Sequence, residues 1–583
     1  MIGMLKKLSK SVREYKQLSI LTLIFIIGEV IIEVLIPFIT ADMVSKIKAG
    51  AEISEVVKTG IVLALMAIVS LACGGIAGFT CAKASAGFAK NLRKDVFHKI
   101  QTYSFENVDK FSSTSLVTRL TTDVTNVQMS YMMIIRTAIR CPLMLIFAIV
   151  MAYVMGGFLV TAFVVVVPVL GFGLYLIGRK AMPAFRRVFK KYDKLNESIE
   201  ENVRGMRVVK GFSRENYERE KFDTAAKDIC ADFTKAEKIV ALNSPLMQVC
   251  LYFNMVFVLF VGSKMTILGQ HGVDVGQISA MLTYGMQILI SLMMLSMIYV
   301  IITMSTESAK RICEVLDEKP ALYNRENPVM SVDNGSIKFE NVSFKYSKEA
   351  KKYALSGINI EIPSGATVGI IGGTGVSKSS LVQLIPRLYD VTDGSVKVAG
   401  IDVRDYDIET LRSAVAMVLQ KNLLFSGTIK ENLLWGNAGA TDEEIVEACK
   451  LAQADDFIQS FPDKYETKIE QGGTNVSGGQ KQRLCIARAL LKKPKILILD
   501  DSTSAVDTKT DAMIRAGFKQ YIPETTKIII AQRIASVEDA DMIIVMDNGA
   551  ITAVGNHEEL LKTSDIYREV YTQQVSGGDS DEE

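Results

Sequence analysis

The first half of the chain alternates between long apolar stretches and polar segments. Six of these stretches are near the roughly 20 residues that an α-helix needs to cross a bilayer. We predict transmembrane helices at residues 18–38, 61–82, 139–155, 158–177, 246–267 and 275–304. The first stretch is too long for the core of a signal peptide, so it is predicted to stay as a membrane anchor. The pattern therefore predicts an all-α membrane domain over residues 1–318.

The polar segments between the stretches differ in charge. The two long loops, 83–138 and 179–238, contain 8 and 16 Lys/Arg, whereas the three connections on the other side contain 3 in all. By the positive-inside rule, both loops and both termini are predicted to be cytoplasmic. The loops keep helical periodicity, so the membrane helices are expected to continue into the cytosol. Their tips, near residues 108–115 and 211–216, are expected to contact a soluble domain.

Two carboxylates interrupt the first apolar stretch. Glu29 and Glu33 are four residues apart, which places them on one face of a helix. Charged groups inside a membrane are costly and by default mark a functional site. Both residues could line a substrate cavity and bind a cation. Alternatively, they face water or pair with a basic residue without touching substrate.

Composition narrows the class of protein. Hydrophobic residues make up 49% of the 583 residues and charged residues 22%, which indicates a membrane part joined to a soluble part. The net charge of +2 argues against a nucleic-acid-binding protein. The eight cysteines form no CxxC pair and no metal-ligand spacing, so we interpret them as free thiols in membrane helices and a reducing cytosol.

The second half has a different pattern. Residues 319–334 lack the apolar periodicity and contain two prolines, which predicts a linker. From there to residue 573, short β-like runs alternate with helical segments, as expected of an α/β domain. The acidic residues 574–583 are predicted to be a disordered tail.

A glycine-rich loop follows the apolar run 368–371 and precedes an apolar helix, the context that a P-loop requires. The predicted ATP-binding residues of the loop are Gly372, Gly373, Thr374, Gly375, Val376, Ser377, Lys378, Ser379 and Ser380. Lys378 would reach the β/γ-phosphates of ATP and the Ser379 hydroxyl would bind Mg²⁺. Ser377 departs from the pattern because this position is normally Gly, and its Cβ could weaken ATP binding.

Two aspartates end the apolar run 496–499. Asp500 would hold Mg²⁺ through water, and Asp501 would polarise the water that attacks the γ-phosphate. The second position is normally Glu, and the Asp side chain is one methylene shorter. Because a misplacement of about 1 Å can cost roughly 10²-fold in rate, slow hydrolysis is expected.

Ser477, Gly478, Gly479 and Gln480 would expose a hydroxyl and backbone donors at a helix N-terminus, which is an anion site suited to phosphate. With this motif the chain, to about residue 573, resembles the ATP-binding cassette (ABC) family of the exporter type. The resemblance implies six transmembrane helices with long cytoplasmic extensions fused to an α/β P-loop NTPase cassette, which acts as a transport ATPase.

The resemblance also implies roles for single residues. Tyr346 would stack on adenine, and Gln420 would bind Mg²⁺ and link it to the membrane domain. The loop 504–507, with Asp507, would cross to a second cassette. The switch histidine of the family is replaced by Gln532, and a neutral amide cannot do the proton or charge work of an imidazole.

In this family two cassettes enclose two ATP molecules, each bound by the P-loop of one chain and the signature of the other. Two altered positions beside an intact signature predict the degenerate-site subunit of a heterodimer with a second half-transporter chain. We expect ATP-driven export of drug-like hydrophobic or amphipathic compounds across the cytoplasmic membrane, as in bacterial multidrug exporters. The alternatives are lipid or peptide export, and a nucleotide-gated regulatory subunit that transports nothing.

Overall fold

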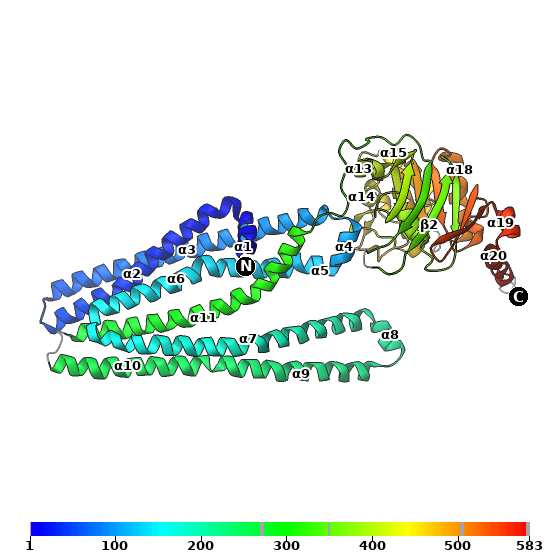
Figure 1. The fold of residues 1–583 in the computed structure, drawn as a ribbon. Helices are drawn as coiled ribbons and strands as arrows, with labels where there is room; N and C mark the ends of the chain where they lie inside the picture. Colours follow the sequence, from blue (N-terminus) through cyan, green and yellow to red (C-terminus); the bar gives the residue numbers. More distant parts are fainter. Residues whose placement is uncertain (1, 269–272, 348–349, 502–506, 579–583) are drawn as a thin grey trace. The chain divides into compact units, whose positions relative to one another are not determined.

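The structure of the protein is a computed structural model, shown as a ribbon in Figure 1. It describes residues 2–268, 273–347, 350–501 and 507–578. The chain forms two compact units: residues 1–102 with 112–318, and residues 103–111 with 319–583. The nine-residue segment 103–111 thus belongs to the second unit, although its sequence neighbours belong to the first.

The first unit is entirely helical. Its helices are α1 (Ile2–Leu8), η1 (Ser9–Tyr15), α2 (Lys16–Lys48), α3 (Ile53–Gln101), α5 (Ser113–Thr118), η2 (Arg119–Asp123), α6 (Val124–Gly156), η3 (Gly157–Val160), α7 (Thr161–Arg204), α8 (Met206–Gly211), α9 (Glu215–Ala241), α10 (Asn243–Ile267) and α11 (Val275–Asp317). Within the described residues, six helical segments are long and apolar enough to cross a membrane. The prediction of six apolar helices is confirmed.

The long helices extend well beyond their apolar stretches, as the loop periodicity predicted. The helix α3 has 49 residues and α7 has 44. Local chemistry sets several helix ends. Gly157, with a φ of +48°, ends α6, and Asp274 opens α11 with a capping box that includes Gln277. Figure 1 shows α2, α3, α6 and α11 running side by side, and α7 beside α9 and α10.

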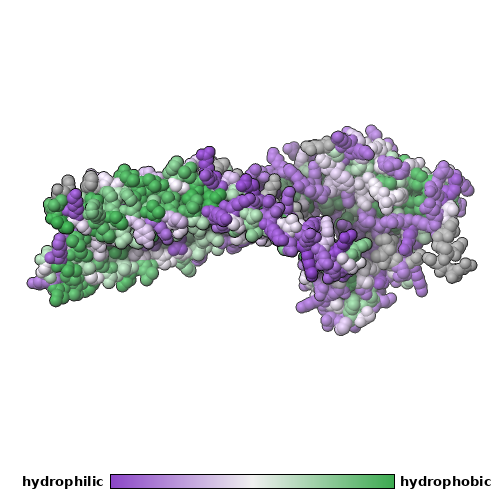
Figure 2. Space-filling view, turned by 90° about the horizontal axis from the view of Figure 1, so that it is seen from below, coloured by the Kyte–Doolittle hydropathy of each residue, from purple (hydrophilic) through white to green (hydrophobic). Residues whose placement is uncertain are grey.

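The surface of this unit is strongly apolar. Figure 2 shows hydrophobic residues over much of the helical unit, whereas the surface of the second unit is mainly hydrophilic. Exposed apolar side chains include Leu71 (77% exposed) and Phe79 (70% exposed) on α3. Because water would penalise so much exposed apolar area, this surface fits the interior of a bilayer.

The second unit contains three sheets. Its strands are β1 (Ile337–Phe344), β2 (Leu355–Ile362), β3 (Thr367–Ile371), β4 (Asp393–Val398), β5 (Ile401–Asp402), β6 (Val415–Val418), β7 (Gly427–Thr428), β8 (Lys468–Ile469), β9 (Ile496–Asp500), β10 (Thr526–Ile530), β11 (Met542–Asp547) and β12 (Ala550–Gly555). The six-stranded sheet has the order β12-β11-β3-β10-β9-β6, and only the β11–β12 pair is antiparallel. A four-stranded sheet has the order β2-β1-β4-β5, and β7 pairs with β8.

Helices surround these sheets. They are α4 (Phe105–Phe111), α12 (Lys378–Gln383), α13 (Ile408–Ala414), α14 (Ile429–Leu434), α15 (Asp442–Leu451), α16 (Asp455–Gln459), η4 (Lys464–Glu466), α17 (Gly478–Leu491), α18 (Thr508–Tyr521), η5 (Ile534–Ser536), α19 (His557–Thr563) and α20 (Asp565–Gly578). The strands β3, β9 and β10 are buried along their whole length, so the core lies on both faces of the large sheet.

The helix α4 is fixed to the second unit by specific contacts. Asn107 donates from Nδ2 to the carbonyl of Lys319 (3.0 Å) and accepts from the backbone N–H of Ala321 (3.0 Å). The hydroxyl of Tyr389 donates to Oδ2 of Asp109 (2.7 Å). The expectation that the first loop tip meets a soluble domain is confirmed for this helix.

The structure describes the predicted linker and part of the predicted tail. Residues 319–334 contain no helix and only an isolated bridge between Val329 and Tyr406. The prediction of a disordered tail over 574–583 is wrong for residues 574–578, because α20 continues to Gly578. Gln574 explains this difference, since its side chain bonds to the backbone of residues 532 and 534. The last five residues lie outside the described chain.

Candidate functional site

Neighbouring parallel strands bring the predicted nucleotide-binding residues to one edge of the sheet. The strand β3 leads into the glycine loop, β9 into Asp500 and Asp501, and β10 towards Gln532. Since β10 pairs in parallel with both β3 and β9, the loops after all three strands meet. They form a cavity of about 310 Å³ that is lined by Thr374, Gly375, Val376, Ser377, Lys378, Ser379, Ser380, Gln420, Asp500, Asp501, Ile530 and Gln532.

The lysine of the loop points back at the loop itself. Lys378 begins α12, and its Nζ donates to the carbonyls of Gly372 (2.7 Å) and Gly373 (2.8 Å). Burial lowers the pKa of Lys378, and the charges of Asp501 and Asp500 oppose that shift. The ammonium group is therefore inside the turn that would wrap the phosphates.

Backbone conformation explains why the position of Ser377 normally holds glycine. Its φ of +69° and ψ of +26° are left-handed, a conformation that costs a non-glycine residue roughly 1–2 kcal/mol. Gly372 shows a stricter need for glycine, because a Cβ there would lie 2.3 Å from the carbonyl oxygen of Met546. Ser377 therefore keeps the shape of the loop but strains it.

The two oxygens predicted to bind Mg²⁺ are in contact. The Oγ of Ser379 donates to Oδ1 of Asp500 (2.9 Å), whose side chain is almost fully buried. Burial raises the pKa of Asp500 and the charge of Asp501 adds to the rise, whereas the bond from Ser379 and the charge of Lys378 lower it. Hydroxyl and carboxylate oxygens are the ligands that Mg²⁺ prefers.

The structure places the two substituted positions in direct contact. The Nε2 of Gln532 donates to Oδ2 of Asp501 (2.9 Å), and Nε2 of Gln420 donates to the same oxygen (3.3 Å). Asp501 itself has a left-handed backbone, with a φ of +48°. Amide donors thus engage the oxygen that a catalytic carboxylate would present to water.

Tyr346 lies at the other end of the glycine loop. Its hydroxyl is 2.7 Å from Oγ of Ser380, and its ring packs edge-on against Phe344 and Tyr389. The side chain is 44% exposed, so one part of the ring remains open. This position is compatible with stacking on a base, which stays a prediction.

The signature residues begin a helix, as predicted. Ser477 caps α17, its hydroxyl accepts from the backbone N–H of Gln480, and Gln480 accepts in return from the N–H of Ser477. Both Ser477 and Gly478 are exposed. Asp507 caps α18, and the N–H of Thr510 lowers the pKa of its carboxyl group. The rest of the loop that was predicted to cross to a second cassette, residues 504–506, lies outside the described residues.

In the membrane helices, both predicted carboxylates face an arginine. The Nη2 of Arg140 on α6 donates to both oxygens of Glu33 (2.8 and 2.7 Å) and lies 3.5 Å from Oε1 of Glu29. The glutamates belong to α2, and Glu29 packs over Gly74 of α3, where a Cβ would lie 3.1 Å from its Oε1. The carboxylates are therefore not free charges.

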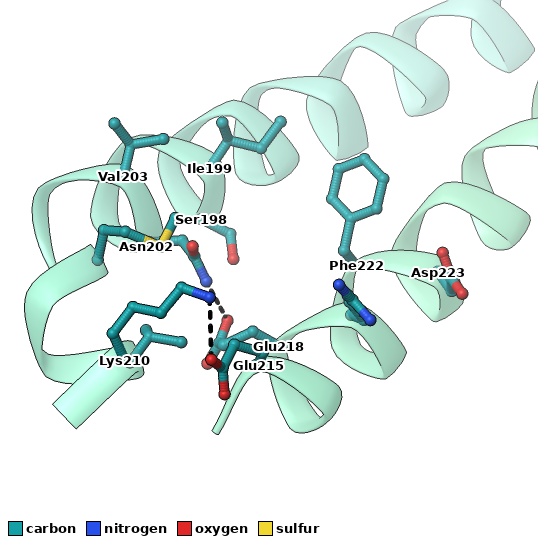
Figure 3. Close-up of a pocket in the computed structure, with 12 residues that line it drawn as sticks. Ser198, Ile199, Asn202, Val203, Lys210, Glu215, Glu218, Phe222 and Asp223 are labelled. Atoms are coloured by element: carbon teal, nitrogen blue, oxygen red, sulfur yellow. Dashed lines mark hydrogen bonds and ion pairs between the residues drawn. The ribbon is translucent and has the colours of Figure 1, made fainter. Parts of the chain in front are cut away.

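A further cavity, of about 610 Å³, lies at the tip formed by α7, α8 and α9 (Figure 3). Its polar rim includes an ion pair between Lys210 and Glu215 (3.0 Å) and a hydrogen bond from Asn202 to Glu218 (2.8 Å). Apolar side chains, among them that of Phe222, line the rest of the cavity. This tip contains the second loop segment that was expected to meet a soluble domain.

Comparison with known proteins agrees with this geometry. Residues 19–293 match the ABC transporter transmembrane region and residues 355–504 match the ABC transporter cassette. The chain is 34% identical to the uncharacterized ABC transporter ATP-binding protein YfiB of Bacillus subtilis (strain 168), over 98% of each chain. The chain belongs to the ABC transporter family.

Two other comparisons place the transporter more closely. It is 31% identical to the ATP-dependent lipid A-core flippase of Desulfotalea psychrophila, over 83% of this chain and 84% of the flippase. A bacterial Atm1-family ABC exporter with ATP bound has the same fold, with a TM-score of 0.82, 24% identity and coverage of 97% and 98% of the two chains. The transporter therefore has the architecture of an exporter half-transporter, and its cassette is that of a transport ATPase.

Sequence reasoning missed two residues of this transporter. Arg140 lies inside a predicted membrane span, and its charge was the signal that could have paired it with Glu33. Gln574 of α20 donates to the carbonyl of Gln532 (2.8 Å) and accepts from the N–H of Ile534 (2.8 Å). It positions the loop that carries Gln532, and no local motif indicates such a contact.

Proposed function

We propose that the transporter exports hydrophobic or amphipathic compounds across the cytoplasmic membrane by alternating access, as the slow-site half of a heterodimer. The observation that carries the slow site is the contact between Asp501 and Gln532. A shortened carboxylate would hold water farther from the phosphorus, and an amide cannot replace an imidazole. A homodimer would contain two such sites and would hydrolyse ATP slowly at both. A different partner chain is therefore favoured.

The signature supports the same division of labour. Among the described residues, the lining of the P-loop cavity includes none of the positions 477–480. Their exposed helix N-terminus suits a phosphate that is bound to another chain. In the heterodimer, Ser477 would therefore complete the competent site, and Asp507 would lie at the boundary between the cassettes.

The oxygen donors of the cavity fit Mg²⁺. Ser379, Gln420 and Asp500 would hold the ion, and it would neutralise charge on the β- and γ-phosphates. Mg²⁺ commonly takes its other ligands from water and phosphate, so a hydroxyl, an amide oxygen and one buried carboxylate suffice as protein ligands. Lys378 would exchange its loop carbonyls for phosphate oxygens.

The tip at α8 supports contact with the second chain. Val208 is 61% exposed and Phe212 is 76% exposed, beside the rim charges of Lys210 and Glu215. An apolar patch with a polar rim is typical of a protein interface. We assign this tip to the soluble domain of the partner chain, and we place the cassette and both termini in the cytoplasm.

The test is ATP turnover by the purified chain, alone and with its partner. The chain alone should hydrolyse ATP slowly, and the partner should raise the rate strongly. Brisk turnover by the chain alone that Asp501→Asn abolishes would refute the slow-site assignment.

Transport measurements separate the alternatives. Inside-out vesicles with both chains should accumulate amphipathic dyes when ATP is added. Movement of labelled phospholipid without movement of dyes would instead favour lipid export, the function named in the flippase relative. ATP binding without any movement would indicate a regulatory subunit.

A further inference from the structure

The membrane cavity is built around a proline that frees a backbone carbonyl. Pro37 of α2 has no N–H, so the carbonyl of Glu33, four residues earlier, loses its helical donor. Gln287 of α11 donates from Nε2 to that carbonyl (3.3 Å), and the hydroxyl of Tyr284 donates to the next carbonyl, that of Val34 (2.8 Å). Neighbouring side chains thus satisfy the backbone, as a lipid environment requires.

A cavity of about 430 Å³ opens beside this proline, between α2, α6 and α11. Both polar and apolar side chains line this cavity. The polar lining residues are Glu33, Thr137, Arg140, Thr283, Gln287 and Ser291, and the apolar ones include Ile36, Met144, Ile290 and Met294. A volume in the range of about 300–1,000 Å³ with both kinds of wall is typical of a site for a small amphipathic molecule.

Two polar atoms of this lining have an unused hydrogen-bonding capacity. Glu33 engages only Nη2 of Arg140, and Nε of Arg140 is buried without a partner in the described part of the chain. The Oε1 of Gln287 is likewise buried and unpaired within the described residues. A guanidinium group has five N–H donors, so the cavity offers donors from Arg140 and an acceptor from Gln287.

We propose that this cavity binds an amphiphile whose head carries an oxyanion next to a hydrogen-bond donor. The oxyanion pairs with the unused donors of Arg140, and the ligand's N–H or O–H donates to Oε1 of Gln287. The apolar tail lies along the methionine and isoleucine side chains. This inference rests on the proposed export function and replaces the cationic substrate that Glu29 and Glu33 suggested in isolation, because the guanidinium group of Arg140 lies against both carboxylates.

The test is equilibrium binding of tritiated N-lauroylglycine to the full chain in phosphatidylcholine nanodiscs. This probe has a carboxylate, an adjacent amide N–H and an apolar tail. Its methyl ester, which lacks the anion, and laurate, which lacks the N–H, should each compete about tenfold less well. Dodecyltrimethylammonium should not compete. Equal competition by the cation would overturn the proposal.

Variants locate the binding. Replacing both residues, by Glu33→Gln with Arg140→Gln, leaves the net charge of the site unchanged and should weaken binding about tenfold or more. The matched control neutralises the ion pair between Lys48, which ends α2, and Asp274, which caps α11 (2.8 Å), by Lys48→Gln with Asp274→Asn, and should bind normally. Gln287→Met should abolish the preference for N-lauroylglycine over laurate. Unchanged binding in the Glu33/Arg140 double variant would overturn the proposal.

Two more arms separate the possible sources of the ligand and the two proposals. Phosphatidylglycerol added to the nanodiscs displaces the probe if a lipid headgroup is the natural ligand, and free amphiphiles are the ligand if it does not. Either outcome supports the oxyanion site. ATP-driven dye accumulation without binding of N-lauroylglycine would overturn the site and leave export intact. Binding without any ATP-driven movement would support the site and remove the export function.

Discussion

The nucleotide cavity and the membrane cavity both gather charged side chains from distant parts of the chain, but only the first gathers them from recognisable sequence motifs. In the cassette, Lys378 ends the glycine loop after β3, Asp500 ends β9 and Asp501 follows it, and the sheet order brings the three together. In the membrane, Glu33 and Arg140 are separated by 107 positions and meet only because α2 packs on α6. The residues of the first site can be recognised from local sequence motifs, whereas the contact in the second site can be recognised only from the packing of the helices.

The difference also concerns the environment of the charges. Asp501 accepts hydrogen bonds from the neutral amides of Gln420 and Gln532 in the lining of the P-loop cavity. In the membrane unit, Glu33 forms an ion pair with Arg140. Removing a charge should therefore alter catalysis in the cassette and stability in the membrane unit.

The largest expected effect is on the division of labour between cassettes. Ser477→Arg should nearly abolish ATPase activity of the heterodimer, because removal of a phosphate contact costs about 10²-fold or more in rate. Asp501→Asn should leave a substantial fraction. The control is Thr441→Arg, which changes the same type of helix cap on α15, outside the P-loop cavity, and should retain activity. If Asp501→Asn silences the complex as fully as Ser477→Arg, the site of this chain is catalytic.

The second prediction concerns the membrane pair. Glu33→Gln should lower the free energy of unfolding by about 2 kcal/mol, because it leaves Arg140 poorly paired in a partly buried position. Adding Arg140→Gln should restore most of that loss. The exposed partner change Lys48→Gln should cost less than about 1 kcal/mol. Thermal unfolding in nanodiscs measures all four proteins, and a double variant less stable than the single one would contradict mutual pairing.

A smaller effect should come from restoring the residues that are usual in the family. Asp501→Glu together with Gln532→His should raise ATP turnover of the purified chain by about tenfold or more, since the longer carboxylate and the imidazole would reposition the attacking water. Steady-state phosphate release measures this change. The single variant Gln532→His serves as the control, because it leaves the short carboxylate in place. No gain in the double variant would mean that geometry elsewhere limits the site.

The sequence predicted those parts of the fold that a hydrophobic pattern or a motif within one short segment specifies. Hydropathy located the six membrane helices of the described residues, and the apolar run predicted at 368–371 lies within β3. Non-local contacts were out of reach. The nine residues of 103–111 join the second unit through Asn107 and Asp109, whose partners lie more than 200 positions away. The same reason hid Arg140 as the partner of Glu33.

Strain was partly visible in the sequence. The replacement of glycine at Ser377 indicated an altered loop, but a left-handed φ cannot be read from residue type alone. Ser377→Gly should tighten ATP binding about fivefold, because it removes about 1 kcal/mol of backbone strain. Asn548→Gly, at another position with positive φ (+47°), should leave binding unchanged. Titration with a fluorescent ATP analogue checks both, and weaker binding by Ser377→Gly would show that the serine hydroxyl contributes contacts.

The smallest expected effect tests the clamp at Gln574. Its partners are backbone atoms of residues 532 and 534, so the clamp should persist in the Asp501→Glu, Gln532→His protein, where turnover is easier to measure. In that background Gln574→Ala should lower kcat about threefold and leave KM unchanged, because loss of these hydrogen bonds costs about 0.5–1.5 kcal/mol in positioning. Gln573→Ala is the matched control, since Gln573 bonds to Glu569 on its own helix. Equal kinetics for the two variants would show that α20 does not position the switch loop.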